Sequence, residues 1–136
     1  MNYNKTVTVV IPTYKRPEMM DKAIKSVLEQ TYRDLELYIV DDNGSGTEDQ
    51  KKTEDFINRY QHDNRVRYLV NEKNMGACAS RNRGINSSEN EFVAFLDDDD
   101  QWDRDFLEEV IAEFEKDSKK KHRCRLYRIQ DIKSRQ

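Results

Sequence analysis

Residues 92–100 read FVAFLDDDD, five apolar residues followed directly by four consecutive aspartates. The apolar part has the length and composition of a buried strand. Three further strand-like runs precede it, namely VTVVI at 7–11, LELYIVDD at 35–42 and VRYLV at 66–70. The sequence therefore predicts four strands, the last of which ends in an acidic run.

Segments with helical spacing of apolar residues lie between and after these strands. Pro17 opens the first, and its apolar face carries Met20, Ala23, Ile24, Val27 and Leu28. The other three lie at residues 47–62, 77–85 and 106–114. This alternation predicts an α/β fold, a Rossmann-like parallel sheet flanked by helices on both faces.

Polar residues follow each predicted strand. In an open parallel sheet the ligand crevice lies at the carboxyl ends of the strands. The residues expected there are Pro12-Thr13-Tyr14, Asp41-Asp42, Asn74-Met75-Gly76 and Asp97–Asp100. We therefore expect a ligand site built from these four loops.

The composition restricts the class of protein. A chain of 136 residues fits one domain, with 35% hydrophobic and 38% charged residues. No run approaches the about 20 apolar residues of a membrane span, and the N-terminus has no secretory pattern, so we expect a cytoplasmic location. Cys78 and Cys124 lie far apart, which favours reduced thiols over a zinc site.

Charge is divided unevenly along the chain. Residues 117–136 carry eight Lys/Arg and two Asp, a balance of +6, so the first 116 residues sum to -9 within the net charge of -3. An acidic body is a poor nucleic-acid binder, and we expect no nucleic-acid partner. The composition break near Lys116 predicts a body of residues 1–116 and a basic tail at 117–136, which could touch an anionic membrane surface.

The acidic run has three interpretations. Side chains alternate along an extended chain, so Asp97 and Asp99 would point one way and Asp98 and Asp100 the other. Two carboxylates that share a direction suit a hard cation such as Mg²⁺ or Mn²⁺. The second interpretation is a solvated turn in which Asp103 caps the helix that contains Phe106. The third is an EF-hand calcium loop starting at Asp97, although Trp102 stands where that loop needs Gly.

Four segments together resemble a known family. VTVVIPTYKRP, YIVDDNGSG, NMGACASRNRGI and FVAFLDDDDQW are similar, in order and spacing, to the N-terminal half of family 2 glycosyltransferases with the GT-A fold. The resemblance covers about residues 5–115. It implies a domain that binds a nucleoside-diphosphate sugar, with uridine diphosphate the usual carrier, and transfers the sugar to an acceptor hydroxyl.

The resemblance also implies roles for single residues. Pro12, Thr13 and Tyr14 would cradle the nucleobase and ribose, with the Tyr14 ring stacked on the base. Arg16 would lie near the phosphates, and Asp41 would accept a hydrogen bond from the base. Without the other motifs, Tyr14 fits a strand-ending turn and Asp41-Asp42 an Asx turn equally well.

The remaining roles concern the sugar and the metal. Gly76 would let the backbone approach the donor closely, and Arg81 would contact a phosphate or the sugar. Asp97-Asp98-Asp99 matches the Asp-x-Asp motif of the family. That match implies that Asp97 and Asp98 contact the donor and that Asp99 binds Mn²⁺ or Mg²⁺. Asp97 would contact the ribose or the sugar, or act as a second metal ligand.

The chain departs from the family pattern after this motif. Relatives continue for roughly another hundred residues, a segment that carries the acceptor site and, in inverting members, a carboxylate general base. Only 37 residues follow Asp99, and Asp131 is the only carboxylate beyond Asp117. We therefore expect a GT-A domain truncated after the Asp-x-Asp motif that binds donor and metal with little turnover. A homodimer could cover the exposed edge.

Two other classes of function fit the same residues. One is a catalytically inactive nucleotide-binding module with the same pocket. The other is a receiver-like domain with Asp41-Asp42 as its acidic pocket. A receiver should carry a lone acceptor Asp after its third strand, where this chain has Asn71.

Overall fold

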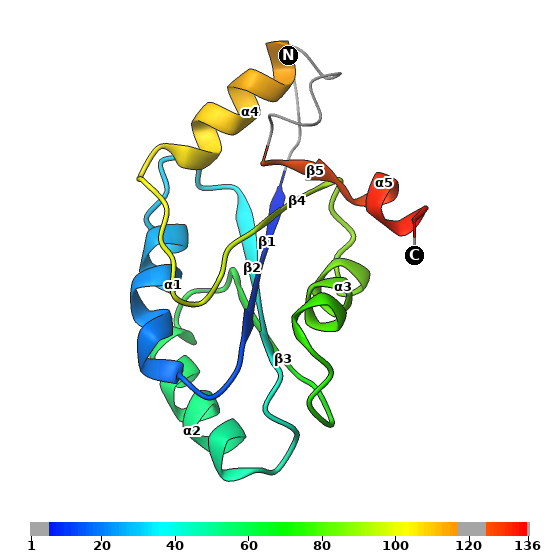
Figure 1. Ribbon diagram of the computed structural model, residues 1–136. Coiled ribbons are helices and arrows are strands. Elements are labelled where there is room, and N and C mark those ends of the chain that lie inside the picture. The colour runs from blue at the N-terminus through cyan, green and yellow to red at the C-terminus, as the bar shows by residue number, and fades with distance from the viewer. Residues whose placement is uncertain (1–5, 117–124, 136) are drawn as a thin grey trace.

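The computed structural model describes residues 6–116 and 125–135 (Figure 1). Within these residues, five strands form one sheet in the order β3-β2-β1-β4-β5. The strands are β1 (Val7–Thr13), β2 (Leu35–Asp41), β3 (Val66–Val70), β4 (Phe92–Phe95) and β5 (Tyr127–Arg128). The first four run parallel, as the sequence predicts, whereas β5 is antiparallel to β4.

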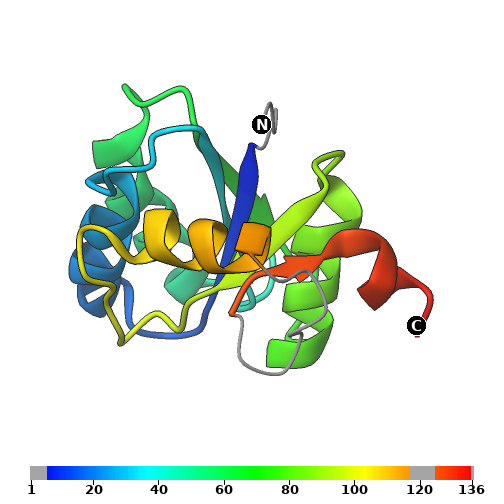
Figure 2. The same ribbon diagram turned by 90° about the horizontal axis from the view of Figure 1, so that it is seen from above.

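Helices cover both faces of this sheet, which confirms the predicted α/β fold. The helices are α1 (Met20–Leu28), α2 (Glu48–Ile57), α3 (Ala77–Ser87), α4 (Phe106–Lys116) and α5 (Ile129–Lys133), with short 3-10 turns at Pro17–Met19 and Asn58–Tyr60. Helices α1, α2 and α4 lie on one face and α3 and α5 on the other, as the two views show (Figures 1 and 2). Among the described residues, no helix is both long and apolar enough for a bilayer crossing.

Alternate residues of β1 serve the two faces of the sheet. Val7, Val9 and Ile11 pack in the core beneath α1, α2 and α4, whereas Val10 packs in the smaller core beneath α3. Both sets are completely buried, which explains why β1 reads as a continuous apolar run.

β1 extends two residues past its predicted end, through Pro12. β4 pairs only with Val7–Val10, and the Val10 carbonyl accepts the last hydrogen bond on that side, from the Leu96 N–H. Pro12 lies two residues later and faces the same edge of β1. Its missing N–H costs no hydrogen bond between strands, because β4 no longer pairs with β1 at that position. β1 and β4 stop pairing at this point, next to the predicted crevice.

The segment after residue 124 was not predicted to join the sheet. β5 pairs with β4, and Leu126 and Ile129 beside it are buried. β5 has only two residues, one of them an arginine, and so gives no apolar run that a sequence pattern could detect. The rest of the predicted basic tail, residues 117–124 and 136, lies outside the described residues.

Helix α3 packs closely against β1 at Gly84. A Cβ atom built on Gly84 would lie 2.7 and 2.8 Å from the two γ-carbons of Val10. Both residues are buried, so neither can move away without disturbing the core. The glycine therefore sets the distance between the helix and the sheet.

We expect Gly84→Ala to destabilise the protein by about 1–3 kcal/mol, because overpacking outweighs the better helix propensity of alanine. Urea unfolding followed by circular dichroism measures the loss. The control is Asn86→Ala on the exposed side of the same helix, with an expected change within about 0.5 kcal/mol. Equal stabilities of the two variants would contradict the packing argument.

Candidate functional site

The carboxyl ends of β1, β2 and β4 meet the start of α3 around a cavity of about 530 Å³. Its lining residues come from three of the four predicted loops, those after β1, β2 and β4, and from the first turns of α3: Pro12, Thr13, Tyr14, Arg16, Asp42, Ala77, Ser80, Arg81, Asp97, Asp98 and Asp99. The predicted crevice therefore exists, and we call it the first cavity.

The aspartate run forms a turn at the edge of this cavity. β4 ends at Phe95, and the Asp100 N–H donates to the Asp97 carbonyl at 3.1 Å. The prediction that Asp98 would point away from Asp97 and Asp99 assumed an extended chain and is wrong. Because the backbone turns, all three side chains line the same cavity.

Asp98 is the buried member of the run, with 4% of its surface exposed. Its carboxylate accepts from the Thr13 hydroxyl at 3.0 Å and pairs with the Arg16 guanidinium at 2.9 Å. That contact raises the pKa of Arg16 above its usual value. Asp98 therefore joins the loop after β1 to the loop after β4.

Asp97 and Asp99 present their carboxylates to solvent, with side chains 64% and 45% exposed. Arg81 approaches Asp97 at 3.3 Å and Arg16 approaches Asp99 at 3.8 Å. Counting Asp42 and Asp98 as well, the cavity lining holds four carboxylates and two guanidinium groups, a formal charge of -2. An anionic ligand would need an additional cation here.

The donor set fits a cation that is shared with a ligand. Within residues 6–116 and 125–135, no three His, Cys, Asp or Glu side chains converge to hold a metal ion. Asp97 and Asp99 are two accessible carboxylates, whereas Asp98 is already paired. Mg²⁺ commonly takes one or two carboxylates and completes its octahedron with water and phosphate oxygens. Asp97 and Asp99 could therefore hold a hard divalent cation jointly with a phosphate-bearing ligand.

Asp42, and not Asp41, lies at the cavity. Asp41 is completely buried, and its carboxylate accepts from the Tyr68 hydroxyl and from the Asn43 backbone and side chain. Burial raises the pKa of Asp41. Leu37 and Ile39 face the α2 side of the sheet, so the period of two along β2 directs Asp41 to that side and Asp42 to the other.

The Asp42 carboxylate organises the loop that leads into α3. One oxygen accepts from the Asn71 side chain at 2.8 Å and from the Met75 N–H at 2.7 Å. The other accepts from the Asn74 side chain and the Gly76 N–H, both at 2.9 Å. A carboxylate offers about four lone-pair sites, and all are used.

Gly76 has a conformational role in this loop. Its φ of 96° and ψ of 163° fall in a region that is essentially restricted to glycine. Gly76 does not line the cavity, whose α3 wall begins at Ala77. The glycine therefore turns the chain into α3, so that Ala77, Ser80 and Arg81 reach the cavity.

Gln30 fastens the loop after the aspartate run to α1. It is 1% exposed, and its amide nitrogen donates to the carbonyls of Ser26 at 2.9 Å and Asp103 at 2.6 Å. Its oxygen accepts from the Leu107 N–H at 2.9 Å at the start of α4. The prediction that the Asp103 side chain caps this helix is therefore not what the structure shows, since Asp103 contributes its backbone carbonyl.

Comparison with known proteins identifies the family. The family profile described as Glycosyl transferase family 2 matches residues 8–131. The chain belongs to glycosyl transferase family 2. A related enzyme of Campylobacter jejuni, GalNAc(5)-diNAcBac-PP-undecaprenol beta-1,3-glucosyltransferase, is 38% identical over 96 residues, which cover 70% of this chain and 30% of the relative.

Solved structures agree with the fold of this family 2 chain. Staphylococcus aureus TarS (residues 1–349) in complex with UDP-GlcNAc superposes with a TM-score of 0.70 at 24% identity, over 82% of this chain and 31% of TarS. Pyrobaculum calidifontis mannosyltransferase PcManGT in complex with GDP-Man and Mn²⁺ gives 0.70 at 23% identity, over 82% and 33%. The chain spans less than half the length of the curated relatives it matches.

The fold and the family membership each remove one of the earlier hypotheses. The acidic run follows strand β4, whereas an EF-hand loop follows a helix. The receiver-like hypothesis fails because a family 2 profile matches the chain through residue 131. The remaining site predictions, for Pro12, Thr13, Tyr14, Arg16, Arg81 and Asp97–Asp99, fall on residues that line the first cavity.

We expect Asp42→Ala to lower the free energy of unfolding by about 1–3 kcal/mol, because four donors lose their acceptor and only the exposed ones regain water. Chemical denaturation measures the change. Asp55→Ala, an exposed aspartate on α2, should change stability by no more than about 0.5 kcal/mol. A loss at Asp42 as small as that control would show that Asp42 does not hold the 71–76 loop.

Proposed function

We propose that this chain binds the nucleoside-diphosphate part of a sugar donor in the first cavity, together with a divalent cation. It would serve as the donor-binding part of an enzyme that transfers the sugar to an acceptor hydroxyl. The observation that carries this proposal is the position of Asp97 and Asp99, two accessible carboxylates beside two arginines. This arrangement suits a diphosphate held through a cation.

The β1 and β2 end of the cavity suits a nucleoside. Tyr14 is 42% exposed, and its ring offers a face for stacking on a base. Asp42 replaces Asp41 as the group that would accept a hydrogen bond from a base N–H. Since its four acceptor sites are occupied, one partner must leave, and the exposed Asn74 side chain is the least costly to release.

The aspartate end suits the phosphates and the leaving group. The acceptor oxygen would attack the anomeric carbon while the bond from that carbon to the diphosphate oxygen breaks, and the electron pair leaves with the diphosphate. Arg16 and Arg81 can donate to that oxygen-rich group. A bound divalent cation would supply Lewis-acid neutralisation of the leaving charge. We assign no residue of this chain to the base that takes the acceptor proton.

The comparisons support the choice of substrates. The solved neighbours were obtained with UDP-GlcNAc and with GDP-Man and Mn²⁺, and the Campylobacter relative is named for a diphosphoundecaprenol-linked substrate. We therefore propose a uridine diphosphate sugar as donor, Mn²⁺ or Mg²⁺ as the ion and a lipid-linked acceptor. A cytoplasmic location, contact of the basic tail with anionic membrane and a homodimer stay predictions.

We expect uridine diphosphate to bind only when Mn²⁺ or Mg²⁺ is present, and Asp99→Asn to weaken that binding about 10-fold or more, a loss near 1.4 kcal/mol. Isothermal titration calorimetry with and without the ion measures both effects. Asp103→Asn removes an exposed carboxylate four residues away that does not line the cavity, and should bind as the wild type does. Metal-independent binding, or unchanged binding by Asp99→Asn, would refute the proposal.

A further inference from the structure

Asn71 follows the last residue of β3 and is almost completely buried, with 4% of its surface exposed. Its backbone N–H donates to the Asp41 carbonyl at 2.8 Å, which fixes its backbone against β2. Its side-chain nitrogen donates to Asp42 Oδ1 at 2.8 Å and to Ser80 Oγ at 3.0 Å. Asp42 and Ser80 both line the first cavity, so a single amide joins two of its walls.

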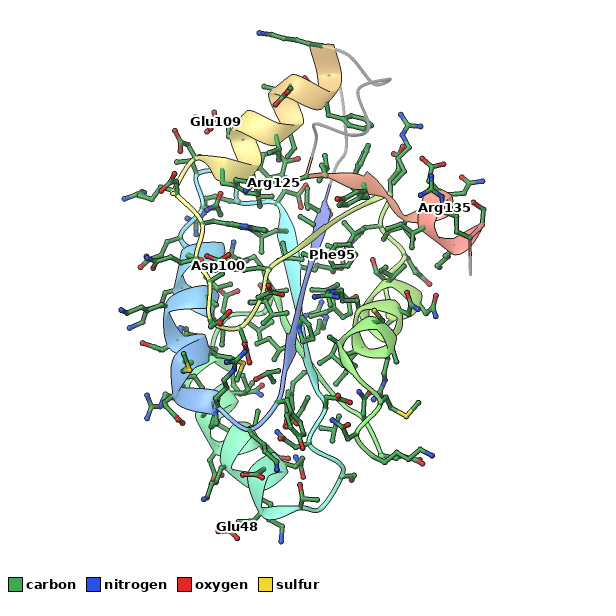
Figure 3. All side chains as sticks on the ribbon, viewed as in Figure 1. Glu48, Phe95, Asp100, Glu109, Arg125 and Arg135 are labelled. Atoms are coloured by element: carbon green, nitrogen blue, oxygen red, sulfur yellow. The ribbon has the colours of Figure 1, made fainter. Side chains whose placement is uncertain are left out.

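Arg83 on α3 holds the oxygen of the same amide. Arg83 Nη1 donates to Asn71 Oδ1 at 2.8 Å and also to the Val70 carbonyl. Side chains fill the space between α3 and the sheet (Figure 3). Arg83 itself is exposed, so its contact with the buried Asn71 links the outer side of α3 to the wall of the first cavity.

The partners on its two sides determine which way the Asn71 amide points. A guanidinium can only donate, and an ionised carboxylate can only accept. The amide oxygen therefore faces Arg83, and the amide nitrogen faces Asp42. Without Arg83, the oxygen of this buried amide would lose its donor, and the amide would tilt toward water to recover one. Such a tilt would weaken the support of Asp42 and Ser80 together.

The two groups that Asn71 supports have different hydrogen-bonding characters. The Asp42 carboxylate is an acceptor. A hydroxyl has one proton, and because Ser80 Oγ accepts from Asn71, its proton can donate to another group. The wall thus presents an acceptor beside a donor. Uracil carries an N–H donor beside a carbonyl acceptor on one edge and fits this pair, whereas cytosine lacks that N–H and would leave the carboxylate unpaired.

We propose that Arg83 is a positioning residue for recognition of the nucleobase. Arg83 holds Asn71, and Asn71 holds Asp42 and Ser80 in position for the base, although Arg83 does not itself line the cavity. This inference rests on the proposed function, because it assigns a base to this end of the first cavity. Loss of Arg83 should therefore reduce the preference for uracil and spare the binding of the phosphates.

The test compares three ligands by isothermal titration calorimetry in Mg²⁺, namely uridine diphosphate, cytidine diphosphate and inorganic pyrophosphate. Pyrophosphate has no base and reports on the aspartate end of the cavity. We expect Arg83→Met to weaken binding of uridine diphosphate about 3- to 10-fold, on the scale of one hydrogen bond. Its preference for uridine diphosphate over cytidine diphosphate should fall by a similar factor. Pyrophosphate binding should stay within about twofold.

Two further variants serve as controls. Arg83→Lys keeps a cationic donor and should retain most of the preference for uridine diphosphate. Arg67→Met is the matched control, because Arg67 is also exposed and also donates to a backbone carbonyl, that of Asn64. The partners of Arg67, Asn64 and Glu36, do not line the cavity, so Arg67→Met should bind all three ligands as the wild type does.

A double-mutant cycle tests whether Arg83 acts through Asn71. In the Asn71→Ala background, adding Arg83→Met should weaken binding of uridine diphosphate by less than about twofold, because the amide that Arg83 holds is absent. An equal loss on adding Arg83→Met with and without Asn71 would overturn the inference. Arg83 is exposed, so the single variant tests the inference even if Asn71→Ala fails to fold.

The outcomes distinguish this inference from the proposed function. If the wild type binds neither uridine diphosphate nor pyrophosphate with metal, the proposed function itself fails. If the wild type prefers uridine diphosphate and Arg83→Met keeps that preference, the positioning role alone fails. Equal affinities of the wild type for the two nucleotides would overturn the inference as well. Loss of uridine diphosphate and pyrophosphate by the same factor in Arg83→Met would show a general structural effect and have the same consequence.

Discussion

The site depends on the buried contact of Asp98 with Thr13 and Arg16. Four consecutive aspartates at a strand end repel one another, and the repulsion must be relieved before the chain can pack. The structure relieves it by turning the run and giving one carboxylate to a hydroxyl and a guanidinium inside the protein. As a result, Asp97 and Asp99 remain accessible on the same cavity.

Each remaining wall of the first cavity is held by a buried polar group whose bonds are satisfied. Asp42 holds the loop before α3, and Gln30 holds the loop after the aspartate run. Within the described residues, no buried side-chain nitrogen or oxygen lacks a partner. A satisfied polar network of this kind fixes loop positions, because breaking any member leaves a desolvated group. The cavity is therefore largely formed without a ligand.

The fold follows from patterns that the sequence displays directly. β3 has the predicted bounds, and the other three parallel strands end within two residues of theirs. β5 was missed because two strand residues carry no periodic signal, and it forms only through pairing with β4. Its position depends on tertiary contacts of Leu126 and Ile129, which no local pattern reveals.

The roles of Gln30 and Asp42 were missed for a different reason, since their signals were present. Gln30 lies three residues after Val27, two residues beyond the end of α1 but at the spacing of its apolar positions, and a polar residue at a buried position must have partners in the core. Asp41 and Asp42 are adjacent, so their side chains face opposite sides of the sheet. Asp41 lies two residues after Ile39 and faces the same side as Leu37 and Ile39, whereas Asp42 faces the other side. Periodicity therefore places Asp42 at the cavity, whereas the resemblance alone had assigned the base contact to Asp41.

The ion pair of Asp97 with Arg81 couples metal and donor in the proposed function. Without a cation, the exposed Asp97 carboxylate engages Arg81. A cation that takes Asp97 would compete with that ion pair and free Arg81 to donate to the diphosphate. It would also cancel the formal charge of -2 that opposes an anionic ligand. Binding of cation and donor should therefore be mutually reinforcing, and linkage requires the same factor in both directions. The acidity of the cavity, unfavourable for a diphosphate alone, thus becomes the basis for selecting a diphosphate that carries its metal.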